Sequence, residues 1–374
     1  MRFVFFTHSL VSDWNHGNAH FLRGVMSEIV ARGYEAIAYE PADGWSRRNL
    51  RDEQGSEAIV AFDRRFPHLI ARTYGSTPDL ASMLQDADVV VVHEWTDPDL
   101  VARLGTIRRG TGAFTLLFHD THHRAISADA DIAGLDLSGY DAVLTFGEIL
   151  SETYRRRGWG RRVFTWHEAA DTRIFRPHPE IAPERDVVWI GNWGDDERSE
   201  SLRSYLLEPV RQLGLSATIH GVRYPDTALA ELRATGATYC GWLANADVPC
   251  AFARHRATVH VPRRPYVSHL PGIPTIRVFE ALACGIPLVS APWEDVEGLF
   301  RPGDDYLVAS SPATMQEQLR RVLEDEDLAR ELRINGLARI MSRHTCAHRV
   351  DELMAILGEL QAGHRVAARR AAAE

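Results

Sequence analysis

The chain has 374 residues, of which 45% are hydrophobic and 25% charged, and its formal net charge is −9 at pH 7. This length favours two domains, or one large one, with ordinary buried cores. The acidic balance, with no dense basic run outside the C-terminal tail, argues against a nucleic-acid-binding surface.

The four cysteines, at 240, 250, 284 and 346, show no C-x-x-C spacing and are typical of reduced thiols in a cytoplasmic protein. The first ten residues lack the features of a signal peptide. No window approaches the roughly 18 apolar residues of a membrane span. We therefore expect a cytoplasmic protein without an integral membrane segment.

The first half of the chain predicts alternating strands and helices. An apolar run at 2–7 predicts a strand, and helically spaced apolar residues from Phe21 to Val30 lead to a second strand at 35–39. Further buried strands are expected at 88–93, 114–119 and 142–146. Residues 1–168 therefore predict a Rossmann-like, doubly wound parallel sheet.

A proline-rich stretch at 169–185 predicts a linker, and a second series of elements follows it. Strands are expected at 186–190, 217–220, 257–261, 286–290 and 306–309, with helices at 199–213 and 313–323. Residues 186–342 thus predict a second Rossmann-like domain. A helix is expected over 343–362 and a frayed tail over 363–374.

The segment 270–290 predicts a loop, a short helix, a turn and a buried strand. Pro274 suits a helix start, and Gly285 suits the left-handed position after its end. The N–H groups of Thr275 and Ile276 would form a phosphate seat. Glu280, about one and a half turns further along, could reach a hydroxyl of the same ligand. A sugar nucleotide offers both groups, whereas the alternative is a carboxylate paired at a domain edge.

The run Arg277–Val289 resembles the nucleotide-sugar motif of group 1 glycosyltransferases of the GT-B fold, closest to the CgeB-like spore-maturation enzymes. The likeness continues through Leu299–Leu307 and His344–Val350. The resemblance implies an α/β protein of two Rossmann-like, doubly wound domains facing a central cleft. It also implies that the C-terminal helix crosses back to the first domain and that Glu280 holds the donor ribose.

The predicted donor site combines glycine loops, an aromatic segment and one arginine. Of the cationic options Arg198, Arg223, Arg263 and Arg277, we favour Arg263, because it lies between a strand and the Gly272 loop. Trp242 could stack on a base or pack in the core. The predicted donor-binding residues are Gly17, Gly191, Asn192, Trp242, Leu243, Arg263, Gly272, Ile273, Thr275, Ile276 and Glu280.

The predicted catalytic residues follow two neighbouring strands of the first domain. By resemblance His119 lies beside the transferring sugar, where it hydrogen-bonds a hydroxyl or stabilises developing charge. Glu94, Asp120 and His119 are candidates for the base that deprotonates the acceptor if the enzyme inverts configuration. The three histidines and one aspartate at 119–123 could suggest a metal site, but their spacing matches no pattern of zinc ligands. The Asp-x-Asp runs at 86–88 and 129–131 lie outside strand ends, so no metal is expected.

The sequence departs from the resemblance at Gly272, where many retaining members carry a glutamate. Donor sugar and stereochemistry therefore stay open, as do the base, which could be that of UDP or GDP, and the acceptor. We expect a metal-independent hexosyltransferase without a cofactor, acting on a sugar, polymer, lipid-linked or small-molecule acceptor in cell-envelope or secondary-metabolite glycosylation. The alternatives are a nucleotide-sugar epimerase, a phosphorylase-like enzyme and a non-catalytic nucleotide-sugar-binding protein.

Overall fold

The computed structural model describes residues 1–371, which form two compact units. Unit 1 comprises Met1–Ser12, Leu22–Glu168 and the residues from Cys346 onward. Unit 2 comprises Asp13–Phe21 and Ala169–Thr345. The segment 13–21, predicted to belong to the first domain, therefore packs with the second unit.

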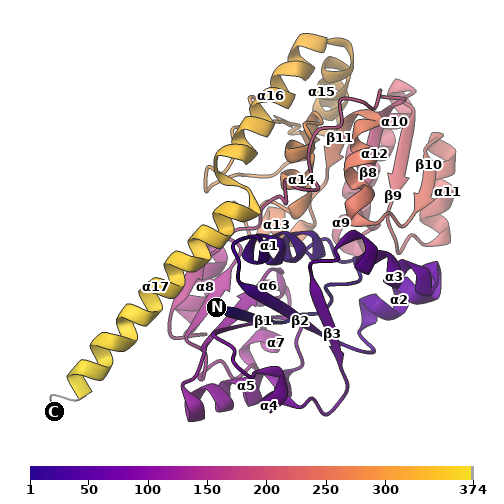
Figure 1. Cartoon of the computed structure of the whole chain (residues 1–374). Helices are drawn as coiled ribbons and strands as arrows, with labels where there is room; N and C mark the ends of the chain where they lie inside the picture. Colours follow the sequence, from indigo (N-terminus) through magenta and orange to yellow (C-terminus); the bar gives the residue numbers. More distant parts are fainter. Residues whose placement is uncertain (372–374) are drawn as a thin grey trace. The chain divides into compact units, whose positions relative to one another are not determined.

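Unit 1 is built on a seven-stranded parallel sheet with the order β3-β2-β1-β4-β5-β6-β7 (Figure 1). Its strands are β1 (Arg2–Phe6), β2 (Glu35–Pro41), β3 (Ile70–Tyr74), β4 (Val89–His93), β5 (Thr115–Asp120), β6 (Ala142–Thr145) and β7 (Val163–Thr165). The central strands are uninterrupted apolar runs because helices cover both faces of such a sheet. Residues Val89–His93 of β4, for example, are all buried.

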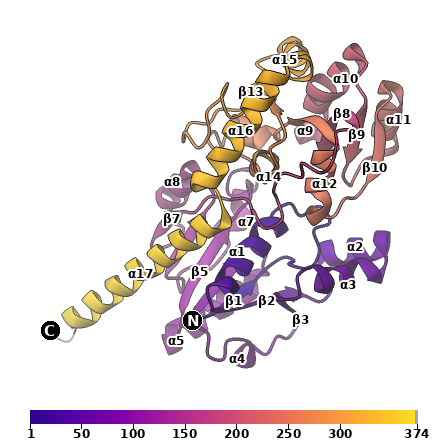
Figure 2. The same cartoon turned by 45° about the horizontal axis from the view of Figure 1, so that its top comes forward.

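The helices connecting these strands are α1 (Ala19–Ala31), α2 (Trp45–Gln54), α3 (Ser56–Arg65), α4 (Leu80–Met83), α5 (Pro98–Thr111), α6 (Arg124–Ser127), α7 (Asp129–Ala133) and α8 (Glu148–Arg157). Helix α5 illustrates the local sequence control. Asp97 caps its start, Pro98 occupies its first turn, and Gly112 ends it in a left-handed conformation. Helices α2 and α3 lie side by side (Figure 2).

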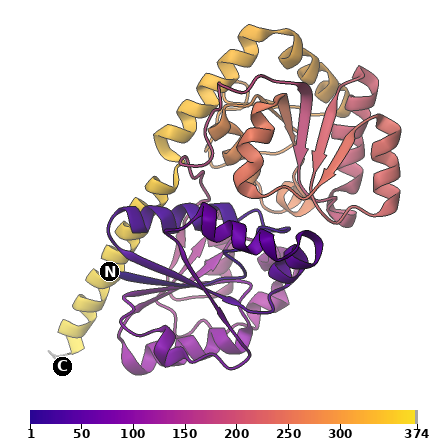
Figure 3. The ribbon, with the colours of Figure 1, turned by 45° about the vertical axis from the view of Figure 1, so that its right-hand side comes forward.

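Unit 2 contains a six-stranded parallel sheet with the order β10-β9-β8-β11-β12-β13. Its strands are β8 (Arg185–Ile190), β9 (Ala217–His220), β10 (Thr238–Gly241), β11 (His255–His260), β12 (Leu288–Ser290) and β13 (Leu307–Val308). Helices flank both faces of this sheet (Figure 3). One face packs Trp189, Ile219 and Val259 into a continuous apolar core with the surrounding helices.

The helices of unit 2 include one continuous helical stretch with a π-turn inside it, where α9 (Asp195–Leu202), η1 (Arg203–Leu207) and α10 (Glu208–Leu213) follow without a break. The sequence predicts this stretch from 199. The others are α11 (Asp226–Thr235), the 3₁₀ turn η2 (Asn245–Asp247), α12 (Val248–Ala253), α13 (Arg264–Ser268), α14 (Ile276–Cys284), α15 (Pro312–Glu324) and α16 (Glu326–Arg343).

Two strands of unit 1 have no counterpart among the sequence-based expectations, and both are edge strands. β3 and β7 form the two ends of the first sheet. Their residues are only partly buried or exposed, so they lack the apolar run that marks a central strand. The tertiary structure places these two strands at the edges of the sheet, so no apolar run marks them in the sequence.

The C-terminal helix α17 (Cys346–Ala371) belongs to unit 1. Trp166 donates through Nε1 to the carbonyl of Arg349 at 2.8 Å, and Arg162 pairs with Glu359. The prediction of a frayed tail from residue 363 is wrong for residues 363–371, which continue helix α17. Alanine and arginine favour a helix as strongly as the earlier residues of α17 do. Residues 372–374 of that predicted tail lie outside the described residues.

Candidate functional site

Glu280 lies fully buried in α14, within unit 2. His20 Nδ1 lies 2.9 Å from its Oε1, and Arg277 pairs with its Oε2. Because His20 Nε2 accepts from the backbone N–H of Asp171 at 2.8 Å, His20 Nδ1 carries the proton and donates to Glu280. His20 is further fixed by stacking on Phe175 at 3.8 Å. Glu280 is thus a paired carboxylate in the middle of α14, and His20 is a partner that the sequence did not indicate.

The loop before α14 brings four predicted residues to one helix N-terminus. Gly272 has φ +92° and donates to the carbonyl of Glu294 at 2.7 Å, so the loop depends on glycine here. Ile273 is buried, and Thr275 is the N-cap of α14, with Ile276 as its first residue. The expected helix start at Pro274 thus lies two residues early.

A histidine relay fixes the Thr275 hydroxyl. Ser290 donates through Oγ to the carbonyl of Ala291 and so accepts from His260 Nδ1 at 2.9 Å. His260 Nε2 lies 3.1 Å from Thr275 Oγ1 and accepts from it. Burial, followed by Arg198 and Arg277, lowers the pKa of His260 to about 3, so the imidazole is neutral at neutral pH. The first turn of α14 carries no acidic residue, which suits an anion at this N-terminus.

Arginine side chains converge on Asn192 in the loop after β8. Arg263 donates through NH2 to Asn192 Oδ1 at 3.0 Å and through NH1 to Glu197 Oε2 at 2.6 Å. Arg198 donates through NH2 to the carbonyl of Asn192 at 2.6 Å and also to Asn192 Oδ1. Asn192 in turn donates through Nδ2 to Asn15. The predicted Arg263 and Asn192 are therefore brought together, and Arg198 joins them.

Arg198 is the most electrostatically strained group of this set. Burial, then Arg263 and, more weakly, Arg277, lower its pKa to about 9. Its Nε is buried without a hydrogen-bond partner within residues 1–371. Three guanidinium groups that repel one another beside a helix N-terminus provide the charge and geometry that phosphate oxygens require. The first turn of α9, by contrast, carries Asp195, Asp196 and Glu197 and is unsuited to phosphate.

Glycine at three positions allows this close packing. A Cβ on Gly191 would lie 2.8 Å from the Trp189 ring, and one on Gly194, which has φ +86°, would lie 2.7 Å from Arg198 Cβ. A Cβ on Gly17 would lie 3.1 Å from Ile276 Cγ2. Gly17 is therefore located within unit 2 beside the predicted residue Ile276, and Gly191 directly precedes the predicted Asn192.

Trp242 and Leu243 follow β10, at the same carboxyl edge of the sheet as Gly191. The indole Nε1 of Trp242 is buried, and no residue in the described part of the chain accepts its hydrogen bond. Leu243 lines a cavity of about 450 Å³ together with His220, Cys240, Asp247 and Cys250, among others. The structure leaves the prediction of base stacking by Trp242 open.

The three predicted catalytic residues lie together at the carboxyl edge of the first sheet. His93 and His119 are register partners on β4 and β5, and their rings meet edge to face at 5.8 Å. His93 Nδ1 lies 2.9 Å from Glu94 Oε2, and its Nε2 lies 3.0 Å from Thr121 Oγ1. Burial, then His93, holds the pKa of His119 well below its usual value. A neutral His119 suits hydrogen bonding to a hydroxyl and does not supply positive charge.

The contacts of Asp120 indicate a structural role. It is fully buried and accepts from Tyr154 Oη at 2.7 Å and from the backbone N–H of His122 at 3.0 Å. Burial, then the Glu94 charge, raises its pKa to about 7. Both carboxyl oxygens of Asp120 are engaged in holding the end of β5. Glu94 is buried as well, but its Oε2 has no hydrogen-bond partner within residues 1–371, so Glu94 is the better candidate for proton transfer.

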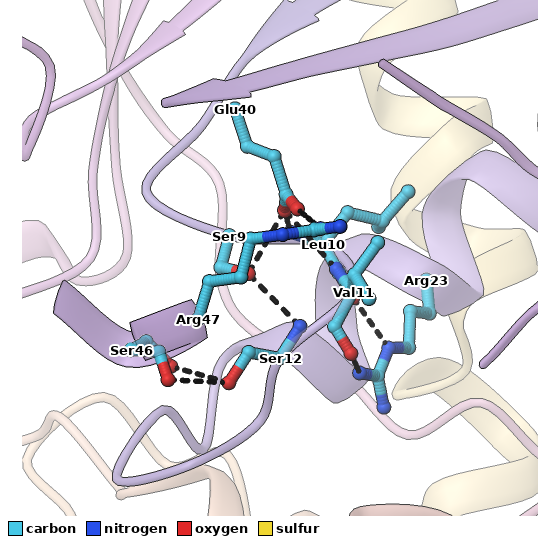
Figure 4. Close-up of polar contacts among 8 residues, drawn as sticks. All are labelled: Ser9, Leu10, Val11, Ser12, Arg23, Glu40, Ser46 and Arg47. Carbon is cyan, nitrogen blue, oxygen red and sulfur yellow. Dashed lines mark hydrogen bonds and ion pairs between the residues drawn. The ribbon is translucent and has the colours of Figure 1, made fainter. Parts of the chain in front are cut away.

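A buried carboxylate organises the loop after β1 in unit 1 (Figure 4). Glu40, at the end of β2, accepts through Oε2 from Ser9 Oγ at 2.8 Å and from the N–H groups of Leu10 and Val11 at 2.6 and 3.2 Å. Arg47 pairs with its other oxygen. The sequence signal for this role is an acidic residue that directly follows the apolar positions 36–39 of this strand.

A family model matches part of the chain. Residues 198–355 match the family described as "Glycosyl transferase-like". This glycosyl transferase-like segment is less than half of the chain and contains Arg198, Arg263 and the whole of α14. A search of curated proteins found no match.

Solved glycosyltransferase structures share the fold. Sucrose-phosphate synthase from Thermosynechococcus elongatus has a TM-score of 0.66 and 13% identity, covering 97% of this chain and 100% of that one. Anabaena HepE, solved with UDP and glucose, has a TM-score of 0.68 and 14% identity, covering 96% and 100%. A Rickettsia africae glycosyltransferase has a TM-score of 0.65 and 11% identity, covering 96% and 98%. The predicted GT-B fold class is therefore confirmed.

Proposed function

We propose that this protein transfers a glycosyl group from a nucleoside diphosphate sugar to an acceptor hydroxyl. The observation that carries the proposal is the arrangement of Arg198, Arg263 and Arg277 beside the N-terminus of α14. The glycosyl transferase-like match spans all three arginines. Similarity to HepE, a protein solved with UDP and with UDP-glucose, supports this class of donor.

We infer that the arginines act on the leaving diphosphate. Breaking the bond between the anomeric carbon and the phosphate oxygen leaves a second negative charge on the nucleotide. Guanidinium groups and the first N–H groups of α14 would stabilise that charge without a metal ion. Arg198 supports this role, because an anion would relieve the repulsion that lowers its pKa. The transferred group is proposed to be a hexose.

Glu280 is proposed to hold the ribose, as its motif suggests. In the structure its oxygens are engaged by His20 and Arg277. We infer that Arg277 turns from Glu280 to the diphosphate when the donor binds, which leaves Glu280 Oε2 to accept from a ribose hydroxyl. His20 keeps its hydrogen bond to Oε1, so the carboxylate stays oriented throughout.

The acceptor is proposed to bind unit 1, where Glu94 would take its hydroxyl proton and neutral His119 would hydrogen-bond the transferred sugar. Glu94 suits this role because its buried Oε2, which lies 2.9 Å from His93 Nδ1, has no hydrogen-bond partner within residues 1–371 and can take up a proton. Within the glycosyltransferases, the runs Arg277–Val289 and His344–Val350 support a CgeB-like subgroup. We propose a cytoplasmic enzyme, in keeping with the four free cysteines. No helix within residues 1–371 is long and apolar enough to span a membrane.

Thermal-shift titration with UDP, GDP and dTDP tests the donor site. At least one of these nucleotides should raise the melting temperature of the wild type, because a ligand of the native state stabilises it. Arg263→Gln should lose most of that shift. Arg211→Gln, in an exposed arginine paired with Glu208, is the matched control and should keep it. A wild type that responds to none of the three nucleotides contradicts the proposal.

Product analysis then separates transfer from the alternatives. Incubation with the matching nucleotide sugar and an acceptor panel should release the nucleoside diphosphate and give a glycosylated acceptor. Isomerised donor without acceptor would indicate an epimerase. Tight binding without any turnover would indicate a non-catalytic binding protein, which the fold by itself does not exclude.

A further inference from the structure

Two exposed tryptophans of unit 1 flank one histidine after strand β1. Trp45 begins α2 and is 41% exposed, and Trp95 follows β4 and is 45% exposed. The His8 ring lies 6.3 Å from Trp45 and 6.2 Å from Trp95. We call these three residues the aromatic platform. Large exposed rings are costly to leave in water, and a group of them on one edge of a sheet indicates a binding surface.

Trp95 is held in place by its neighbours. The guanidinium of Arg124 lies 4.3 Å from the centroid of its ring, and the ring of His122 meets it edge to face at 5.2 Å. Arg124 is itself fixed by donating to the carbonyl of Glu94 at 3.2 Å. An exposed tryptophan packed in this way loses little side-chain entropy when a ligand covers it.

The Glu40 network of Figure 4 holds the other side of the platform. Glu40 binds the loop directly after His8 and also pairs with Arg47, two residues after Trp45. Ser12 Oγ lies 2.8 Å from Ser46 Oγ and donates to the carbonyl of Ser46 at 2.9 Å. The loop that carries His8 and the helix start that carries Trp45 are thereby joined as one rigid piece.

The chemistry of the platform suits a neutral, hydroxyl-rich ligand. Burial, then His93, lowers the pKa of His8 to about 4, so its imidazole is neutral at neutral pH and can accept or donate a hydrogen bond. Asp43 lies two residues before Trp45, and Asp97 two residues after Trp95. Both carboxylates are exposed and accept hydrogen bonds from hydroxyl groups, and with the Arg124 guanidinium over Trp95 they give the platform charges of both signs.

We propose that the aromatic platform binds a pyranose ring of a neutral saccharide acceptor, with a C–H face of the sugar stacked on indole and its hydroxyls bonded to His8. The role as acceptor site, though not the binding of sugar, rests on the proposed function. Trp95 directly follows Glu94, whose side chain is buried, so the platform lies one residue from the proposed base in the chain. Glu40 acts as a positioning residue, because it orders the platform and touches no substrate.

Fluorine NMR of the full chain labelled with 5-fluorotryptophan tests the binding. The nine tryptophans give nine signals, and those of Trp45 and Trp95 are assigned by their loss in Trp45→Phe and Trp95→Phe. Titration with methyl β-D-glucopyranoside, methyl β-D-galactopyranoside and maltose should shift both signals. Glucitol, which carries similar hydroxyls but no ring, should leave them in place.

Variants measure the energetic contribution of each ring. Trp45→Ala and Trp95→Ala should each weaken binding of the preferred saccharide roughly tenfold or more, by analogy with the loss of other stacked rings. Phenylalanine at either position should restore part of the affinity, which a merely structural role would not predict. Val60→Ala, an exposed apolar residue of α3 in the same unit, is the control. Glu40→Gln should broaden the Trp45 signal and weaken binding without abolishing it.

The outcomes separate this proposal from the proposed function. If no saccharide shifts the two signals, if glucitol shifts them equally, or if uridine shifts them more, the platform proposal is wrong. Binding of UDP, GDP or dTDP is measured separately and depends on the arginines of unit 2. Saccharide binding without any nucleotide binding would contradict the glycosyltransferase proposal and leave a sugar-binding platform, and the reverse result would contradict the platform alone.

Discussion

Replacing Arg198 tests the proposed donor site through two opposite effects, on stability and on nucleotide binding. Its pKa falls from 12.5 to about 9, mainly through burial and then through Arg263. That fall corresponds to roughly 5 kcal/mol of unfavourable free energy for the charged form at 1.36 kcal/mol per pKa unit, and partial exposure of the side chain reduces it to a few kcal/mol. A neutral side chain of similar length should therefore be tolerated, and Arg198→Met should unfold at the same free energy as the wild type or a higher one.

The same substitution should damage nucleotide binding. A charge-assisted hydrogen bond contributes about 1.5–3 kcal/mol, so Arg198→Met should raise the Kd for the preferred nucleoside diphosphate roughly 10- to 150-fold. Urea unfolding gives the stability, and isothermal titration calorimetry gives the affinity. The loss should shrink as salt is added, because the interaction is electrostatic.

Arg203→Met is the matched control, since exposed Arg203 lies five residues further along the same helical stretch and pairs with Glu231. It should leave nucleotide affinity unchanged. The reasoning is refuted if Arg198→Met binds nucleotide as tightly as the control. It is also refuted if Arg198→Met is several kcal/mol less stable than the wild type, because the Arg198 charge would then stabilise the fold instead of serving mainly to bind the ligand.

Three further predictions concern stability. The pKa of Asp120 in the folded chain is about 7, above its ordinary value of 3.8. The free energy of unfolding should therefore fall as pH rises from about 4 to about 7, by up to about 1.4 kcal/mol per pH unit. Asp120→Asn should remove this slope in a series of urea unfolding curves, and an unchanged slope would assign it to another group. A Cβ on Gly139 would lie 2.3 Å from the carbonyl oxygen of Gly105, so Gly139→Ala should lower the free energy of unfolding by about 1–3 kcal/mol while nucleotide affinity stays constant. The control is Gly110→Ala in helix α5, where a Cβ meets nothing within 4 Å, and it should leave stability unchanged or raise it by up to about 1 kcal/mol. His20→Ala removes one partner of the buried Glu280 and should cost about 3 kcal/mol. Loss of the half-buried His178, paired with exposed Glu180, should cost less than about 1 kcal/mol, and equal losses would show that burial of the pair does not matter.

Much of the fold can be predicted from the sequence because central parallel strands are locally marked. The runs at 2–7 and 88–93 are apolar at every position that both faces of the sheet must bury. Gly285 ends α14 at φ +63°, as its residue type predicts. The local pattern of 270–290 likewise indicated a helix N-terminus suited to phosphate, with Glu280 inside the helix.

The tertiary structure decided which distant groups meet, and local patterns contain no information about that. His20 reaches Glu280 across 260 residues of chain, and segment 13–21 joins the second unit rather than the first. Arg198 and Arg263 become one cationic group only because Asn192 accepts from both. Edge strands β3 and β7, the Glu40 network and the aromatic platform are likewise products of packing, since each depends on burial or contact between residues that follow different strands. The sequence by itself therefore determined the fold class and the position of the donor motif, and the three-dimensional packing determined the charges and partners around it.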